Sequence, residues 1–327
     1  MKRALAVLFA AFAGVGQVAA VPPPAPPAPQ EVARQLVAAF QSGRAAAIQS
    51  KLAADRPVLE QGVRTFPQDP FIHFALAICQ MGQGGQSAAA ADNLKSAYTL
   101  SHKNLSVGLI YALALKNNRQ PQAACQVAGE MAALHPDIPQ VQIGLATLDM
   151  AVQKYAEAIT VLETLQRRMP ASFRDADRSE LAFMLGTCHL YAGEPAKAIA
   201  ALNQSLALTP RQAPVLAVLG EAWLKTGESA KAVVALDQAL AINPDHPAAL
   251  YHRGLCYEQA GNPAAAQKCF QAGYGKEKPR LQEQGEDYYL MYLLCQKTGQ
   301  AAEGEQCRAA AARLGFSFAA PWQKRQK

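Results

Sequence analysis

The chain has 327 residues, of which 50% are apolar, 17% are charged and only 7% are aromatic. This composition excludes a disordered or collagen-like chain, and the scarcity of aromatic residues beside abundant alanine favours helices over a β-sandwich or barrel. The net charge of +6 falls to about +1 once the terminal cations Lys2, Arg3, Lys324, Arg325 and Lys327 are set aside, so no nucleic-acid partner is expected.

The first twenty residues have the pattern of a secretory signal peptide. Lys2 and Arg3 precede about ten apolar residues, and the small residues Val18 and Ala20 stand where a signal peptidase needs them. We therefore expect cleavage after Ala20 and an exported protein, periplasmic or secreted. An uncleaved anchor is the alternative, although the apolar stretch is short for a membrane span.

Two further segments flank the predicted folded body. Residues 21–29 contain six prolines and predict an extended linker, because proline cannot donate a backbone hydrogen bond. Residues 319–327 form a basic tail. Membrane contact is expected only through the signal segment or this tail.

Three segments of the sequence align without gaps at a spacing of 34 residues. Counted from units that start near residues 179, 213 and 247, the matching residues fall at positions 8, 15, 20 and 24. In that order they are Gly186, Gly220 and Gly254; Gly193, Gly227 and Gly261; Ala198, Ala232 and Ala266; Leu202, Leu236 and Phe270.

This pattern resembles the tetratricopeptide repeat family, whose units are helix pairs of 34 residues. Weaker units start near residues 71, 105 and 139, and a degenerate one near 285, so the repeats cover 71–318. The resemblance implies an all-α fold, an α-solenoid of stacked antiparallel helix pairs that winds as a right-handed superhelix. A single pair cannot bury its own apolar face, so neighbouring pairs must stack.

Three places depart from the repeat. Residues 30–70 predict an N-terminal helical cap or an eroded repeat, with breaks at Ser42-Gly43 and before Pro57. Six extra residues, 173–178, precede the unit near 179, and four, 281–284, precede the unit near 285. A lengthened loop is the favoured interpretation of both insertions, and a change of superhelical direction is the alternative.

The sequence contains no motif typical of catalysis or of phosphate, metal or cofactor binding. Its six histidines show no i,i+4 pair, and its seven cysteines form no C-x-x-C. Cys256 and Cys269, and likewise Cys295 and Cys307, fall on opposing helices of one unit. Either pair could form a disulfide in an exported protein, or all seven cysteines could be small buried hydrophobic residues.

The concave face is the remaining candidate for a site. In the family that the chain resembles, the first helix of each unit lines this face. The candidate partner-binding residues are therefore Phe183, Thr187, Tyr191, Glu221, Lys225, Tyr251, Leu255, Tyr289 and Leu293. The four aromatic ones are the expected anchors. The alternative is that these side chains only pack inside the superhelix.

These observations predict a non-enzymatic protein-binding scaffold or adaptor of the cell envelope, which binds a partner segment in its concave groove. A glycan- or peptidoglycan-binding solenoid is one alternative, and exposed aromatic rings with carboxylates along the groove would favour it. An accessory subunit of an envelope enzyme or secretion complex is another. The partner's identity and the oligomeric state stay open.

Overall fold

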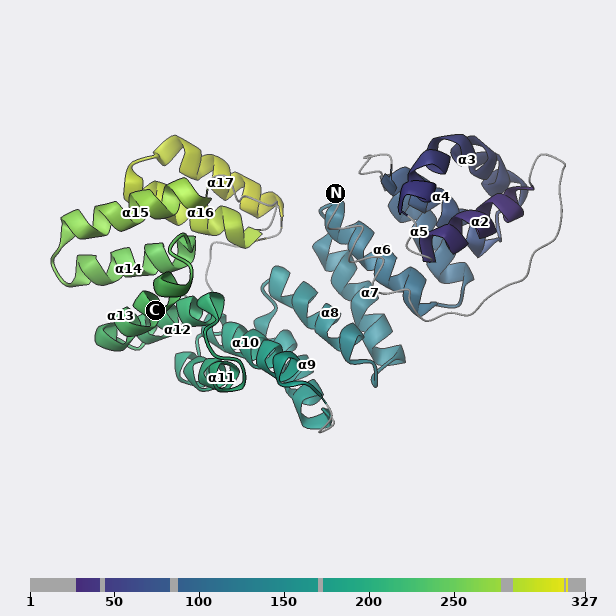
Figure 1. Cartoon of the computed structure of the whole chain (residues 1–327). Helices are drawn as coiled ribbons and strands as arrows, with labels where there is room; N and C mark the ends of the chain where they lie inside the picture. The colour runs from purple at the N-terminus through teal and green to yellow at the C-terminus, as the bar shows by residue number, and fades with distance from the viewer. Residues whose placement is uncertain are drawn as a thin grey trace, which may run out of the picture. The chain divides into compact units, whose positions relative to one another are not determined.

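The structure is a computed structural model, and it consists of helices (Figure 1). Within the described residues there are sixteen helices and no strand, so the predicted all-α class is confirmed. None of these helices is both long enough and apolar enough to cross a bilayer. The described residues are 28–41, 45–82, 88–169, 173–277, 285–314 and 316.

The predicted signal peptide, nearly all of the proline-rich linker and the basic tail lie outside the described residues. The chain divides into two compact units, Met1–His135 and Pro136–Lys327. Each unit is a stack of helix pairs and is described by itself below.

Unit 1 contains three helix pairs, in which each helix packs against its sequence neighbour. Its core is built around fully buried aliphatic side chains, among them Leu36, Leu59, Ile72 and Leu94. The pairs are α2 (Pro29–Gln41) with α3 (Ala45–Thr65), α4 (Pro70–Gly82) with α5 (Ala88–Leu100), and α6 (Leu105–Asn117) with α7 (Pro121–Leu134).

The predicted break before Pro57 is wrong, because α3 continues through this residue. Proline in a helix interior removes one backbone hydrogen bond and costs about 3 kcal/mol. Leu52 and Leu59 lie on either side of Pro57, are 5% and 0% exposed, and pack into the core of unit 1. Burial of these side chains offsets the lost backbone bond, so tertiary packing overrides the local signal.

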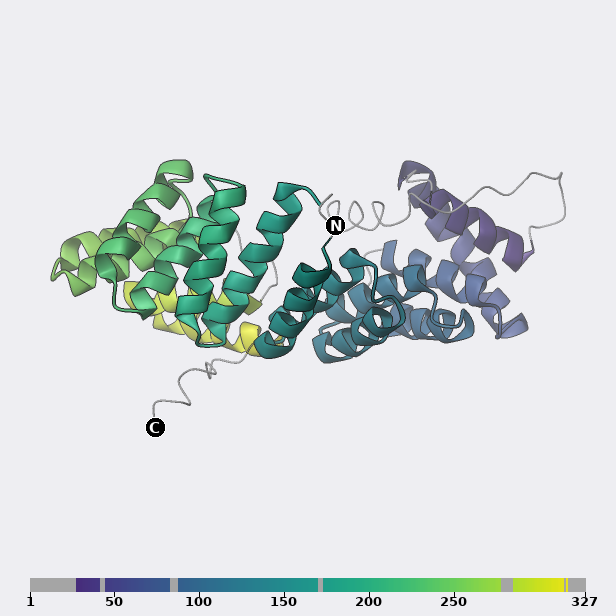
Figure 2. The ribbon, with the colours of Figure 1, turned by 90° about the horizontal axis from the view of Figure 1, so that it is seen from below.

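Unit 2 contains five helix pairs that follow one another along the chain (Figure 2). Each helix packs against the next, and among the first helices α12 also contacts α10 and α14. The pairs are α8 (Pro139–Ala151) with α9 (Tyr155–Arg168), α10 (Asp175–Tyr191) with α11 (Pro195–Leu208), α12 (Ala213–Lys225) with α13 (Ser229–Ile242), α14 (Pro247–Gln259) with α15 (Pro263–Glu277), and α16 (Gly285–Thr298) with α17 (Ala301–Arg313).

The insertion at residues 173–178 is not simply a longer loop. Its last four residues form the first turn of α10, which therefore begins at Asp175 rather than at Ser179. The Arg174 guanidinium donates to both carboxylate oxygens of Asp177, at 2.9 and 2.8 Å, and acidic side chains in a first turn also favour the helix dipole. The second insertion, 281–284, lies outside the described residues.

The turn between the two helices of a repeat has the geometry that the glycine spacing predicts. Gly193, Gly227, Gly261 and Gly299 have φ between +70° and +82°, the left-handed region in which glycine avoids a Cβ clash. In the weaker units the same position is held by Arg119 and Gln153, whose φ values are +60° and +61°. These turns keep the shape of the repeat without its usual residue.

Alanine at position 20 lets the two helices of a unit approach closely. Each of these alanines is at most 2% exposed: Ala90, Ala124, Ala158, Ala198, Ala232 and Ala266. A buried polar contact adds to the packing between two neighbouring repeats of unit 2. The Ser179 hydroxyl donates to the Ser205 carbonyl at 2.9 Å and accepts from the Gln212 amide at 2.9 Å. It ties α10 and α11 to the residue before α12.

Candidate functional site

Unit 2 contains a pocket of about 230 Å³ on the side formed by its first helices. Four consecutive first helices, α10, α12, α14 and α16, contribute to it, together with Gln153 before α9, Tyr155 at the start of α9, and Phe316. The lining side chains are Gln153, Tyr155, Tyr191, Ala217, Val218, Glu221, Lys225, Ala248, Tyr251, His252, Glu286, Asp287, Tyr289, Leu290, Leu293 and Phe316.

Glu221 is the polar centre of this pocket. It lies on α12, and its carboxylate contacts a group on each neighbouring first helix. Tyr191 of α10 donates its hydroxyl to Oε2 at 3.4 Å, and Nε2 of His252 on α14 lies 3.3 Å from the same oxygen. On α12 itself, Lys225 lies one turn further along and places its Nζ 3.4 Å from Oε1.

These contacts keep Glu221 charged. Burial by itself would raise the pKa of this carboxyl, but the neighbouring His252 and Lys225 outweigh it and lower the pKa from 4.5 to about 2. The side chains of Glu221 and His252 are each 13% exposed, whereas that of Lys225 is 25% exposed. Lys225 is therefore the more solvated partner of the carboxylate.

Aromatic rings form much of the wall. Tyr155 and Tyr191 lie with ring centroids 5.5 Å apart, and Tyr289 and Phe316 lie 5.3 Å apart. The Tyr191 pKa is raised well above 10 by Glu221, by burial and by Glu286, in that order. Its phenol therefore stays protonated and can donate a hydrogen bond throughout the physiological range.

The structure brings together six of the nine residues that the sequence nominated. Tyr191, Glu221, Lys225, Tyr251, Tyr289 and Leu293 all line the pocket. Tyr251 is only 7% exposed, however, and its ring packs on Phe270 at 5.8 Å. It is a wall residue with little free surface.

The other three nominated residues lie outside this pocket. Phe183 packs against the core between α10 and α12, and Leu255 packs against the cluster around Tyr251 and Phe270. The Thr187 hydroxyl donates to the Phe183 carbonyl of its own helix at 3.0 Å. Partner binding by these three residues stays a prediction.

The sequence analysis missed four lining residues, although one of them, Glu286, is at position 2 of the last repeat and so is at a face position of a first helix. Tyr155 belongs to a second helix, Glu286 and Asp287 to the first turn of α16, and Phe316 to the segment after the last pair. His252 follows Tyr251, a predicted face residue. A search for a basic side chain near Glu221 could have identified it.

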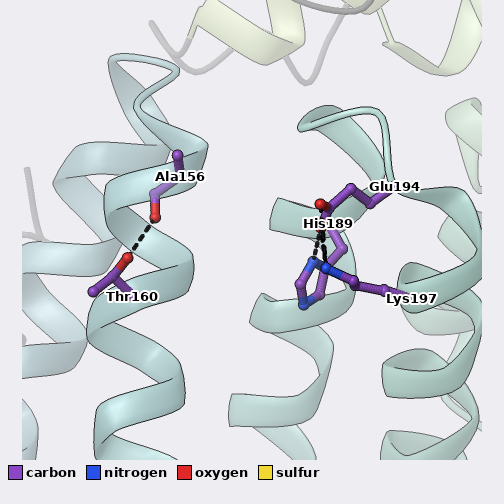
Figure 3. Close-up of polar contacts among 5 residues, drawn as sticks. All are labelled: Ala156, Thr160, His189, Glu194 and Lys197. Carbon is purple, nitrogen blue, oxygen red and sulfur yellow. Dashed lines mark hydrogen bonds and ion pairs between the residues drawn. The ribbon is translucent and has the colours of Figure 1, made fainter.

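The histidines show no metal-binding arrangement. Within the described residues there is no cluster of three or more His, Cys, Asp or Glu side chains that could hold a metal ion. His189, which replaces the usual aromatic residue of its unit, places Nδ1 2.8 Å from Oε2 of Glu194, and Lys197 contacts the same carboxylate (Figure 3). The pKa of Glu194 is lowered by this hydrogen bond from His189, so the trio stabilises the turn between α10 and α11.

All seven cysteines lie in the described part of the chain, and none of them forms a disulfide there. Neither Cys256 with Cys269 nor Cys295 with Cys307 is bonded in the structure, and six of the seven are buried. The arrangement matches that of small apolar core residues, and the two disulfides stay a prediction for the protein in an oxidising compartment.

Comparison with known proteins gives the same architecture. Family models of the tetratricopeptide repeat match residues 143–214, 183–241 and 224–273. A solved tetratricopeptide repeat protein from Parabacteroides merdae ATCC 43184 is 14% identical, covers 82% of this chain and 98% of its own, and superposes with a TM-score of 0.57. At this identity the likeness concerns the fold alone.

Two shorter solved structures are also similar. MamA from Desulfovibrio magneticus RS-1 is 17% identical over 54% of this chain and 96% of its own, with a TM-score of 0.45. YrrB, a TPR protein with an unusual peptide-binding site, is 17% identical over 59% of this chain and 93% of its own, with a TM-score of 0.42. No curated protein matches the chain.

Proposed function

We propose that this chain, whose residues 143–273 match models of the tetratricopeptide repeat, is a non-enzymatic scaffold that binds a segment of a partner protein. The binding face is the pocket side of unit 2. The observation that carries the proposal is that four consecutive first helices contribute side chains to one pocket around Glu221.

The wall of this pocket has the composition of a recognition site. It combines apolar side chains such as Val218 and Leu290 with a few hydrogen-bonding groups that other residues hold in place. Tyr191 and Tyr289 are only partly buried, so both offer ring surface to an incoming segment. Tyrosine is enriched at interface hot spots because its large apolar ring ends in a polar group.

We place this scaffold in the cell envelope, as an exported protein. The support for export is the sequence of residues 1–20, with its basic start, apolar run and small residues before the expected cleavage point at Ala20. The mass of the chain isolated from its own cells tests this proposal. A mature protein that begins at Val21 is expected, and a chain that retains Met1 to Ala20 in the cytosol contradicts export.

Matched tyrosine variants test the binding face. Tyr289 lines the pocket, whereas its neighbour Tyr288 packs against Met291, Cys295 and Cys307 on another side of the same helix. Tyr289→Ala and Tyr288→Ala remove the same atoms from α16. We expect affinity capture of partners to fall at least tenfold with Tyr289→Ala and to stay near wild type with Tyr288→Ala.

Both variants must retain the helical circular dichroism of the wild type, so that the comparison concerns binding rather than folding. If Tyr289→Ala and Tyr288→Ala capture equal amounts of partner, the partner binds outside this pocket.

A glycan ligand is the second candidate function, because the pocket does combine tyrosine rings with carboxylates. A sugar ring needs a wide, open ring face, and here the contacts of Tyr191 with Tyr155 and of Tyr289 with Phe316 reduce the open ring surface without covering it all. This pairing makes a peptide segment the better fit. Titration with peptidoglycan fragments, followed by Trp223 fluorescence, distinguishes the two functions, and saturable binding that Tyr289→Ala abolishes would favour the glycan.

A further inference from the structure

The pocket of unit 2 is acidic. Three carboxylates line it, Glu221 from α12 and Glu286 and Asp287 from the first turn of α16. Among the lining side chains that the structure describes, Lys225 is the one permanent cation, and His252 adds a positive charge only when it is protonated. Both side chains contact the Glu221 carboxylate.

The carboxylates raise the pKa of two tyrosines in the pocket, Tyr191 and Tyr289. Glu221 is the leading cause of the raised pKa of Tyr191, with Glu286 contributing as well. Burial raises the pKa of Tyr289 first, and Glu221 raises it further. Two carboxylates on different helices therefore act on the same small volume.

The size of the pocket limits what can enter. A volume of about 230 Å³ is several times the roughly 30 Å³ of a water molecule and smaller than the roughly 300–1,000 Å³ typical of a drug-sized ligand site. It suits one long side chain. Aromatic rings and carboxylates together attract a cation with an apolar stem, because the ring face and the carboxylate oxygens are both electron-rich.

We infer that this pocket takes the cationic side chain of one lysine or arginine in the partner segment, held among Glu221, Glu286, Asp287 and the tyrosine rings. The inference rests on the proposed function and specifies the partner's chemistry. Lys225 is the competing cation from this chain itself. Because its side chain is more exposed than Glu221, it can turn towards solvent when the partner's cation arrives.

This assignment predicts effects of opposite sign for two charge changes. Glu286→Gln removes an attracting charge from an exposed position and weakens binding of a basic segment. Lys225→Met removes the competitor, keeps its apolar stem and strengthens binding. Glu228→Gln is the matched control. Glu228 immediately precedes α13, forms an ion pair with Lys231 at 3.3 Å, and does not line the pocket.

The probe is a library of random linear nine-residue peptides displayed on phage, selected against the mature chain. Selected peptides are expected to share one basic position. In fluorescence anisotropy, replacing that residue by citrulline (for arginine) or norleucine (for lysine) should weaken binding about tenfold. Glu286→Gln should weaken it at least threefold, Lys225→Met should tighten it at least threefold, and Glu228→Gln should change it less than twofold.

The outcomes separate this inference from the proposed function. The inference of a cationic side chain is overturned if the selected peptides share no basic position, or if Glu286→Gln and Lys225→Met leave the affinities unchanged. The proposed peptide-binding scaffold is then retained. Failure to select any peptide overturns both. Selection of acidic peptides that Lys225→Met weakens also overturns the inference, since the lysine would then be the recognising group.

Discussion

A Cβ atom added to Gly220 would lie 2.5 Å from Cγ of Leu236, which is closer than two carbon atoms can approach without displacement. Gly220 is at position 8 of its unit and Leu236 is at position 24. The same relationship joins Gly186 to Leu202 and Gly254 to the ring of Phe270. A glycine on the first helix therefore creates the space that a large side chain of the second helix fills.

Gly220→Ala is expected to destabilise unit 2 by about 1–3 kcal/mol, because Leu236 is fully buried and has no room to move. Leu236→Ala alone should cost about 2–5 kcal/mol through the cavity it leaves. In the double variant the new methyl group occupies part of that cavity. In a double-mutant cycle measured by urea unfolding, the double variant should therefore lose less free energy of unfolding than the two single variants together. Strict additivity of the two losses would contradict the contact.

The turn glycine Gly227 tests the backbone rather than the packing. Its φ is +80°, and a Cβ there would meet no atom within 4 Å, so the cost of Gly227→Ala is conformational, about 1 kcal/mol. The matched control is Gly144→Ala in the interior of α8, where a Cβ also meets nothing. This change should stabilise by roughly 0.5–1 kcal/mol. Opposite shifts of the thermal midpoint are expected, and equal shifts would contradict the left-handed turn.

Glu221 makes the stability of unit 2 depend on pH. In the unfolded chain its carboxyl has a pKa near 4.5, and in the folded chain the pKa is about 2, so the unfolded state binds the proton first. The stabilisation is therefore complete above pH 4.5, declines as the pH falls, and is lost near pH 2.

Glu221→Gln should remove this part of the pH dependence. Unfolding can be followed by fluorescence of Trp223, which lies on the same helix, in a background in which the second tryptophan, Trp322, is replaced by phenylalanine. A local reporter is needed because repeat stacks unfold segment by segment. An unchanged slope between pH 5 and pH 2.5 in the variant would contradict the role assigned to Glu221.

The cysteines should differ strongly in reactivity. Burial raises the pKa of Cys79 and of Cys188 to about 12, so almost no thiolate exists at pH 8, whereas Cys269 is only partly buried. Under native conditions iodoacetamide should label Cys269 first, and Cys79 and Cys188 only after unfolding. In denaturant without reductant, seven adducts would show that all seven cysteines are thiols, and five adducts would show that one disulfide is present.

The repeat spacing predicted most of the fold because each unit repeats the same contacts. Leu105, Pro139, Ala213 and Pro247 begin helices where the period of 34 residues starts a unit. The departures have local causes, such as the Arg174–Asp177 contact that extends α10. Arg119 and Gln153 show that stacking with neighbours can hold a turn whose sequence lacks glycine.

The pocket was only partly predictable. Face positions on first helices led to Tyr191, Glu221 and Tyr289, because those positions repeat with the units. Tyr155 and Phe316 could not be found in this way, since Tyr155 begins a second helix and Phe316 follows the last pair. Phe183 shows the converse, because a face position can be filled by packing between neighbouring helices.

Site-specific photo-crosslinking tests the central claim most directly. A benzoylphenylalanine probe at Val218, which lines the pocket, is compared with one at Val234, which is 58% exposed on α13. In cells that make the protein, the probe at Val218 should form a covalent adduct with a partner and the probe at Val234 should not. Adducts from Val234 with none from Val218 would place the binding surface on the second helices and contradict the account.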